Sequence, residues 1–76
     1  MPTVEIEYCV PCGFLDRAEQ VQHALLTTFR EQLDAVTLRT GANGVFNVSV
    51  DGEMVFDKTD EEYDVDEIVR RVREQV

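Results

Sequence analysis

Two cysteines stand three positions apart in the stretch YCVPCG, residues 8–13, and these are the only cysteines in the chain. Val10 and Pro11 separate Cys9 from Cys12, and Gly13 follows them. Two thiols at this spacing can form a disulfide, exchange it with a partner's disulfide, or supply half of a tetrahedral metal site. The C-x-x-C pattern beside a strand–helix unit favours the redox use.

Three other interpretations of the pair stay open. A zinc site within one chain needs four ligands. The single histidine, His23, lies off the apolar side of its expected helix, about three turns beyond Cys12, and we expect it to face solvent. The second open interpretation is a zinc site that bridges two copies of the chain. The third is that both cysteines are inert. The acidic run 57–67 lacks the glycine and the spacing of an EF-hand, so we expect neither metal nor cofactor.

The expected position of the pair explains its reactivity. Cys9 ends a predicted strand and Cys12 begins a predicted helix, with Pro11 suited to the first helical turn. The free amide hydrogens and the positive dipole at a helix start lower a cysteine pKa below its usual value of about 8.5. The second thiol can then resolve a mixed disulfide. These arguments do not decide which of Cys9 and Cys12 attacks.

Hydrophobic periodicity places the pair in a small α/β domain that spans residues 1–76. Alternating apolar residues predict strands over 3–8, 35–40, 45–50 and 53–57. The first strand directs Val4, Ile6 and Tyr8 inward, and the last directs Met54 and Phe56 inward. Helical spacing predicts one helix over about 13–32 and another after Asp64. The first helix buries a stripe consisting of Phe14, Ala18, Val21, Leu25 and Phe29, widened by Leu26 and Leu33.

Local signals mark two junctions. Asp51-Gly52 predicts a two-residue hairpin. Asp64 as N-cap and Glu67 three residues later form a capping-box pattern, and Tyr63 with Ile68 can form the hydrophobic staple. The second helix buries a stripe consisting of Val65, Ile68, Val69, Val72 and Val76.

The order βαβββα predicts a two-layer sandwich with a four-stranded mixed sheet and both helices on one face. The other face would carry polar residues, namely Glu5, Glu7, Arg39, Asn47 and Ser49, and would be open to solvent or a partner.

Charge excludes several classes of partner. Sixteen acidic and seven basic residues give a net charge of -9, which disfavours nucleic acid and anionic membranes. Six of the basic residues are Arg and only Lys58 is Lys, a balance that suggests a halophilic, haloarchaeal host. The start MPTVEIEY lacks the features of a signal peptide, and no stretch is long enough for a membrane span. We therefore expect a cytoplasmic monomer.

The chain resembles the Rdx family, whose best-known members are selenoprotein W and its relatives T and H. The resemblance rests on strand–C-x-x-C–helix, on the strand pattern G-x-F-x-V at residues 44–48, and on the D-G hairpin. It implies a thioredoxin-like fold and a thiol oxidoreductase that acts on protein or low-molecular-weight disulfides, often glutathione-linked. Selenocysteine takes the second motif position in some relatives, which implies that Cys12 is reactive and Cys9 its partner. Phe46 of the G-x-F-x-V strand is expected in the core beside the helix start.

The chain departs from the family pattern in two places. Asn47 replaces the usual Glu, and the segment 58–63 is acidic where relatives carry a basic, glycine-containing loop. No proline stands where thioredoxin has its substrate clamp. We therefore expect a narrow set of partners and no dedicated site for an anion beside this loop. The alternative function is a redox-sensing interaction module that uses the open sheet face.

Overall fold

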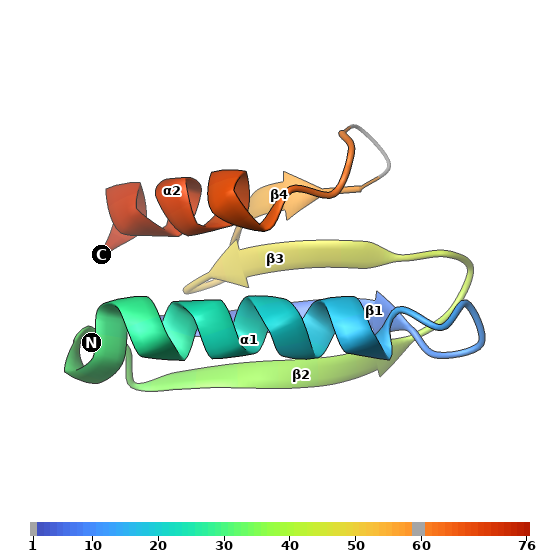
Figure 1. Cartoon of the computed structure of the whole chain (residues 1–76), viewed down its shortest axis with the longest axis horizontal. Coiled ribbons are helices and arrows are strands. Elements are labelled where there is room, and N and C mark those ends of the chain that lie inside the picture. The colour runs from blue at the N-terminus through green and yellow to red at the C-terminus, as the bar shows by residue number, and fades with distance from the viewer. Residues whose placement is uncertain (1, 59–60) are drawn as a thin grey trace.

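A four-stranded mixed sheet with two α-helices on one face forms the protein (Figure 1), in a computed structural model that describes residues 2–58 and 61–76. The order of elements matches the predicted βαβββα. The elements are β1 (Thr3–Cys9), α1 (Leu15–Phe29), the short 3-10 helix η1 (Arg30–Gln32), β2 (Ala35–Gly41), β3 (Phe46–Val50), β4 (Glu53–Asp57) and α2 (Val65–Gln75).

The sheet order is β2-β1-β3-β4, so β1 is an interior strand. β1 pairs in parallel with β2, as a strand–helix–strand unit requires, and antiparallel with β3. The carboxyl end of β1 therefore lies beside the end of β2 and the start of β3. Residues that follow β1 are held between two neighbouring strands.

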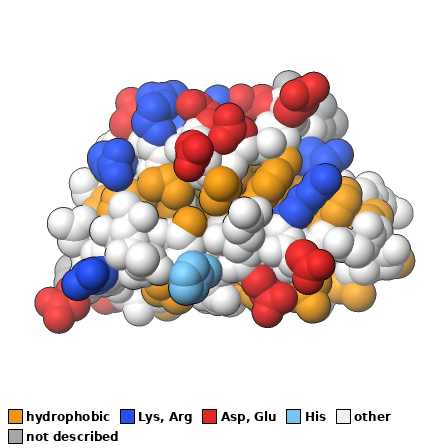
Figure 2. Space-filling view, in the orientation of Figure 1, with side chains coloured by type: hydrophobic (Ala, Val, Ile, Leu, Met, Phe, Trp, Pro, Cys, Tyr) orange, Lys and Arg blue, Asp and Glu red, His pale blue; other side chains and the backbone are white. Residues whose placement is uncertain are grey.

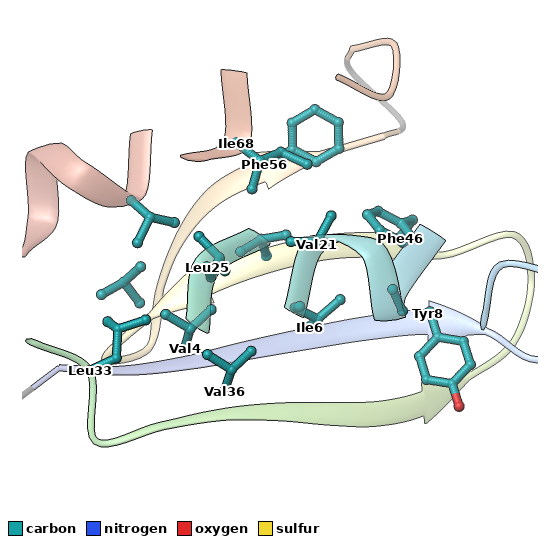
Figure 3. Close-up of a cluster of buried hydrophobic side chains, with 14 of the residues drawn as sticks. Val4, Ile6, Tyr8, Val21, Leu25, Leu33, Val36, Phe46, Phe56 and Ile68 are labelled. Atoms are coloured by element: carbon teal, nitrogen blue, oxygen red, sulfur yellow. The ribbon is translucent and has the colours of Figure 1, made fainter. Parts of the chain in front are cut away.

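The core lies between the sheet and the helices (Figure 3). Val4, Ile6 and Tyr8 alternate with the partly or fully exposed Thr3, Glu5 and Glu7 along β1, which confirms the predicted period-two pattern. Phe46, Phe56 and Leu25 are among the largest fully buried side chains. The opposite face is polar, as expected, and carries an ion pair between Arg39 and Glu5 at 3.3 Å.

The hairpin between β3 and β4 is confirmed, but one inward assignment is wrong. Asp51 and Gly52 both have positive φ, 51° and 87°, as a type I′ turn requires. A register shift at Val48/Ser49 then aligns Met54 with Ser49, whose side chain faces away from the helices, while Phe56 stays opposite Val48. Met54 is accordingly 54% exposed instead of buried.

The first helix is shorter than expected. α1 begins at Leu15, not near Gly13, and its last predicted turn is the 3-10 helix η1. Pro11 therefore lies in a turn before the helix and not in its first turn. Leu26 is exposed instead of widening the buried stripe, whereas Leu33 is buried. On α2, Ile68 and Val72 are buried but Val76 is exposed.

Candidate redox site

Cys9 is the last residue of β1 and is fixed by strands on both sides. It is aligned with Gly41 of β2, and its backbone N–H donates to the Val45 carbonyl oxygen at 2.7 Å. The next amide, Val10, donates to the Gly41 carbonyl oxygen at 3.1 Å. The chain leaves the sheet immediately after this point.

A tight turn then brings Cys12 back to Cys9. The Gly13 N–H donates to the Val10 carbonyl oxygen at 3.2 Å, and the Phe14 N–H donates to the Cys9 carbonyl oxygen at 3.4 Å. Gly13 has φ +76°, a left-handed conformation in which a side chain would be strained. This explains Gly13 by the geometry of the turn.

The turn places the two Cα atoms 5.3 Å apart, and the sulfurs are joined in a disulfide, at a separation typical of such bonds. The two cysteines differ completely in exposure. Cys9 is fully buried, whereas Cys12 is exposed. Val10, Pro11 and Gly13 around Cys12 are exposed too, and Val10 is 51% exposed. An external reagent can therefore approach Cys12, whereas no part of Cys9 is accessible.

A side chain from the β2–β3 connection packs against Gly41, the residue aligned with Cys9 in the ladder. A Cβ built on Gly41 would lie 2.7 Å from Cγ1 of Val45 and 3.1 Å from Cγ of Glu7. The space at Gly41, opposite Cys9, is thus filled by the Val45 methyl group. The sequence did not predict that Val45 packs against Gly41.

An aromatic cluster supports the turn from the other side. The ring of Phe46 is buried and packs edge-to-face against two other rings. Its centroid lies 6.1 Å from that of Phe14 and 5.6 Å from that of Tyr63. These contacts join β3, the N-cap of α1 and the segment before α2, and they confirm that Phe46 is core beside the helix start. The Tyr63 hydroxyl donates to Oε1 of Gln20 at 2.5 Å. Burial raises the pKa of Tyr63.

Two cations lie against the same cluster. The guanidinium of Arg17 is 5.2 Å from the ring centroids of both Phe14 and Tyr63, and Nζ of Lys58 is 5.4 Å from that of Phe14. Both distances suit cation–π contact. Sequence reasoning missed these two residues, although the spacing of Phe14 and Arg17 on one helix gave a signal.

In the segment before α2, the acidic residue Glu61 is paired with Arg71 of that helix. Both carboxylate oxygens of Glu61 accept hydrogen bonds from the Arg71 guanidinium, which also donates to Glu67 and to the Val55 carbonyl oxygen. These bonds lower the pKa of Glu61. Part of the acidic loop predicted at 58–63, namely residues 59–60, lies outside the described residues.

Neither a metal cluster nor a spanning helix is found in the part of the chain that the structure describes. No group of three or more His, Cys, Asp and Glu residues there could hold a metal ion. His23 is exposed on α1, as expected. Among the same residues, no helix has the length and apolar character to cross a membrane.

Comparison with known proteins places these features in a family. The Rdx family model matches residues 3–74. A Bordetella parapertussis protein of known structure superposes with a TM-score of 0.94 at 32% identity, covering 99% of this chain and 98% of that one. A selenoprotein W-related protein from Vibrio cholerae superposes with a TM-score of 0.91 at 25% identity, covering 97% of this chain and 95% of that one. The family and the thioredoxin-like fold of these neighbours agree with the resemblance stated from the motifs.

Curated relatives extend beyond the aligned region. Migration and invasion enhancer 1 from Bos taurus is 32% identical over 75 residues, and that from Mus musculus is 31% identical. Each alignment covers 90% of this chain but only 62% of the relative, so the chain spans about three fifths of their length. None of these matches supports the haloarchaeal origin, which stays a prediction. The family and the Cys9–Cys12 pair together indicate a redox-related function.

Proposed function

Because the chain belongs to the Rdx family, we propose that it is a small thiol–disulfide oxidoreductase whose reactive pair is Cys9 and Cys12. One observation carries the proposal: the two cysteines are bonded to each other, and one is exposed while the other is fully buried. That asymmetry gives each sulfur a separate task. Cys12 meets the substrate, and Cys9 resolves the adduct.

In the first step the Cys12 thiolate attacks one sulfur of a substrate disulfide. A bond forms between Cys12 and that sulfur, the substrate's own S–S bond breaks, and the other substrate sulfur leaves as a thiolate. Phe14, the N-cap of α1, offers no side-chain acceptor to the first-turn amides. Cys12 precedes this uncapped helix start by two residues, where the local dipole favours a thiolate.

In the second step Cys9 loses its proton and attacks the Cys12 sulfur. The mixed disulfide breaks, the remaining substrate sulfur leaves as a thiolate, and the Cys9–Cys12 bond forms. The substrate gains two electrons and the protein dithiol loses them. The short turn keeps Cys9 close enough for this step, since the Cα atoms are 5.3 Å apart. A low-molecular-weight or protein thiol must then reduce the protein, as the cytoplasm would provide.

The exposed residues Val10, Pro11 and Gly13 surround Cys12 and would form the first surface that a partner meets. Neither proline of the chain can supply a thioredoxin-type clamp, because Pro2 precedes β1 and Pro11 lies between the cysteines. A partner set narrower than that of thioredoxin is therefore part of the proposal.

A matched pair of variants tests the assignment of the two sulfurs. Cys9→Ser should form a stable mixed disulfide with hydroxyethyl disulfide through Cys12, detected by intact-protein mass spectrometry, because nothing resolves it. Cys12→Ser should react at least tenfold more slowly, because its remaining thiol is buried. Equal trapping by both variants would contradict the assignment.

Turnover separates the oxidoreductase from the redox-sensing module. The wild type should catalyse repeated reduction of hydroxyethyl disulfide by a dithiol. Cys12→Ser should lose this activity, and Cys9→Ser should keep only the slower turnover in which the external dithiol resolves the mixed disulfide on Cys12. Failure of the wild type to turn over, while the double serine variant still binds partners through the open sheet face, would favour the sensing module instead.

A further inference from the structure

Within residues 2–58 and 61–76, the two cations beside Phe14, Arg17 and Lys58, have no acidic partner in an ion pair, unlike most of the other cations there. Arg39 pairs with Glu5, Arg70 with Glu67 and Glu74, and Arg71 with Glu61 and Glu67. Among the described residues, no ion pair is formed by Arg17 or Lys58. In a chain with 16 acidic and seven basic residues, two unpaired cations on one ring are unexpected.

Their position relates them to the reactive sulfur. Phe14 follows Cys12 by two residues, which span at most about 7 Å. Arg17 and Lys58 approach the same Phe14 ring from α1 and from the end of β4. In Figure 2, blue side chains lie beside orange ones toward the right-hand end, where Figure 1 places the turn after β1, with acidic groups above and below them.

In the described part of the acidic loop, no carboxylate forms an ion pair with these two cations. Glu61 is turned toward α2, where Arg71 neutralises it, while Lys58 is turned toward Phe14. The backbone holds Lys58 there, because its N–H donates to the Phe46 carbonyl oxygen at 2.9 Å. The acidic composition of the loop predicted a surface unfavourable to anions, whereas the described part of the loop presents a cation on the motif side.

We propose that Arg17 and Lys58 are specificity-determining residues that favour disulfide substrates carrying a carboxylate next to the reacting sulfurs. The proposal rests on the proposed function. A substrate bonded to Cys12 is attached two residues before Phe14, where two positive charges would attract a carboxylate and repel an ammonium group. A neutral disulfide would be indifferent to both charges.

The test compares three disulfides that differ in charge: dithiobis(nitrobenzoate), which is anionic, neutral hydroxyethyl disulfide and cationic cystamine. Rates of oxidation of the reduced protein are measured at low salt for the wild type, Arg17→Gln, Lys58→Gln and the double variant. Each single change should lower the ratio of the anionic to the cationic rate roughly threefold to tenfold. The loss should shrink toward unity in molar salt.

The neutral disulfide separates this inference from the proposed function. If hydroxyethyl disulfide oxidises the wild type but the charge ratios are the same in all variants, the oxidoreductase stands and the specificity proposal is overturned. If hydroxyethyl disulfide does not react with Cys12 at all, the proposed function itself fails. A change in thiolate reactivity alone would alter all three rates in parallel and leave the ratios unchanged, which also overturns the proposal.

Arg73→Gln provides the matched control. Arg73 also stacks on an aromatic ring, that of Phe29 at 5.8 Å, and its loss changes the net charge by the same amount. Phe29 ends α1, about 20 Å along the helix from its start, so this variant should keep the wild-type ratio. An equal effect from Arg73→Gln would show that net charge alone sets the preference.

The carboxylate can belong to a small molecule or to a protein, and a second arm distinguishes these sources. Two short peptide disulfides are compared that differ only in Asp or Lys beside the cysteine. A preference for the Asp peptide that disappears in the double variant extends the specificity to protein substrates. A charge preference confined to the small disulfides restricts the proposal to low-molecular-weight substrates.

Discussion

Gly41 occupies a position in the sheet where an added side chain would meet its neighbours. It lies opposite Cys9 in the parallel ladder, and Val45 occupies the space that a Cβ would need, at 2.7 Å from Cγ1. Gly41→Ala must therefore displace Val45 or the backbone. We expect a loss of about 1–3 kcal/mol in the free energy of unfolding, as for other cases of overpacking, measured by urea denaturation of the oxidised protein.

Val45→Ala supplies the control for this prediction. In the Gly41→Ala background it removes the clashing methyl groups, so the double variant should regain part of the lost stability. The coupling energy between the two sites should be non-zero in a double-mutant cycle. Strictly additive losses would mean that the clash at Gly41 is with Glu7 or the backbone instead of Val45.

At the scale of single residues, the sequence predicted the cysteine pair but not its environment. Cys9 and Cys12 follow from spacing, and Phe46 follows from strand alternation. Val45, whose carbonyl oxygen accepts the Cys9 N–H and whose methyl group fills the space at Gly41, comes from a loop more than 30 residues later. Arg17 and Lys58 meet on Phe14 only after β4 is placed. Contacts between segments distant in the chain have no local periodicity to reveal them.

Among the elements, α2 has the clearest start signal, and its N-cap is confirmed. Oδ1 of Asp64 accepts hydrogen bonds from the backbone N–H groups of Asp66 at 3.0 Å and Glu67 at 3.3 Å. Asp64→Ala should lower the free energy of unfolding by about 1 kcal/mol, within a range of 0.5–2. Asp64→Asn keeps an oxygen acceptor and should lose much less. Thermal and urea unfolding check both variants, and equal losses would contradict capping as the cause.

The other half of the capping-box pattern is replaced by ion pairs. Glu67 binds Arg70 and Arg71. Hydrogen bonds from Arg70, and then from Arg71, lower the pKa of Glu67 to about 2. A carboxyl whose pKa is lowered by folding stabilises the protein above its unfolded pKa, near 4.3, and loses that contribution as the pH falls toward the folded value. Stability should therefore decline between about pH 5 and pH 2.

Arg71→Gln should weaken this pH dependence. Arg71 is the donor to Glu61 and the second donor to Glu67, so its loss moves both carboxyl pKa values toward their ordinary range. The variant should be less stable at pH 7, and its unfolding midpoint should fall less steeply between pH 5 and pH 2. Arg73→Gln, on the same helix but without an ion pair among the described residues, should keep the wild-type slope. Parallel pH profiles for all three proteins would contradict the assignment.

The elements themselves were largely predictable from the sequence, and the exception has a physical reason. Strand alternation and helical spacing reproduced the order of elements because each has one buried face. Met54 was assigned to the wrong face because the register shift at Val48/Ser49 inserts a residue and reverses the alternation. A two-residue period read along the chain cannot detect such a shift.

For the molecule as a whole, the excess of acidic residues places a high density of negative charge on a small surface. A net charge of -9 is spread over a body of only 32 × 20 × 19 Å. No buried polar or charged residue is found among the described residues, so these carboxylates lie at or near solvent. At low ionic strength the Debye length reaches about 30 Å, and the excess negative charges repel one another across the whole molecule.

Salt should therefore stabilise the protein. We expect the unfolding temperature of the oxidised form to rise by roughly 5–10 °C from dilute buffer to 1 M KCl, measured by calorimetry. Simple screening is nearly complete at 1 M, where the Debye length is about 3 Å. A curve that levels off there indicates an ordinary acidic protein, because further salt has little repulsion left to screen. A rise that continues to 3 M would support the halophilic prediction, since hydration of dense carboxylates then adds to screening. An insensitive or falling curve would contradict the salt prediction altogether.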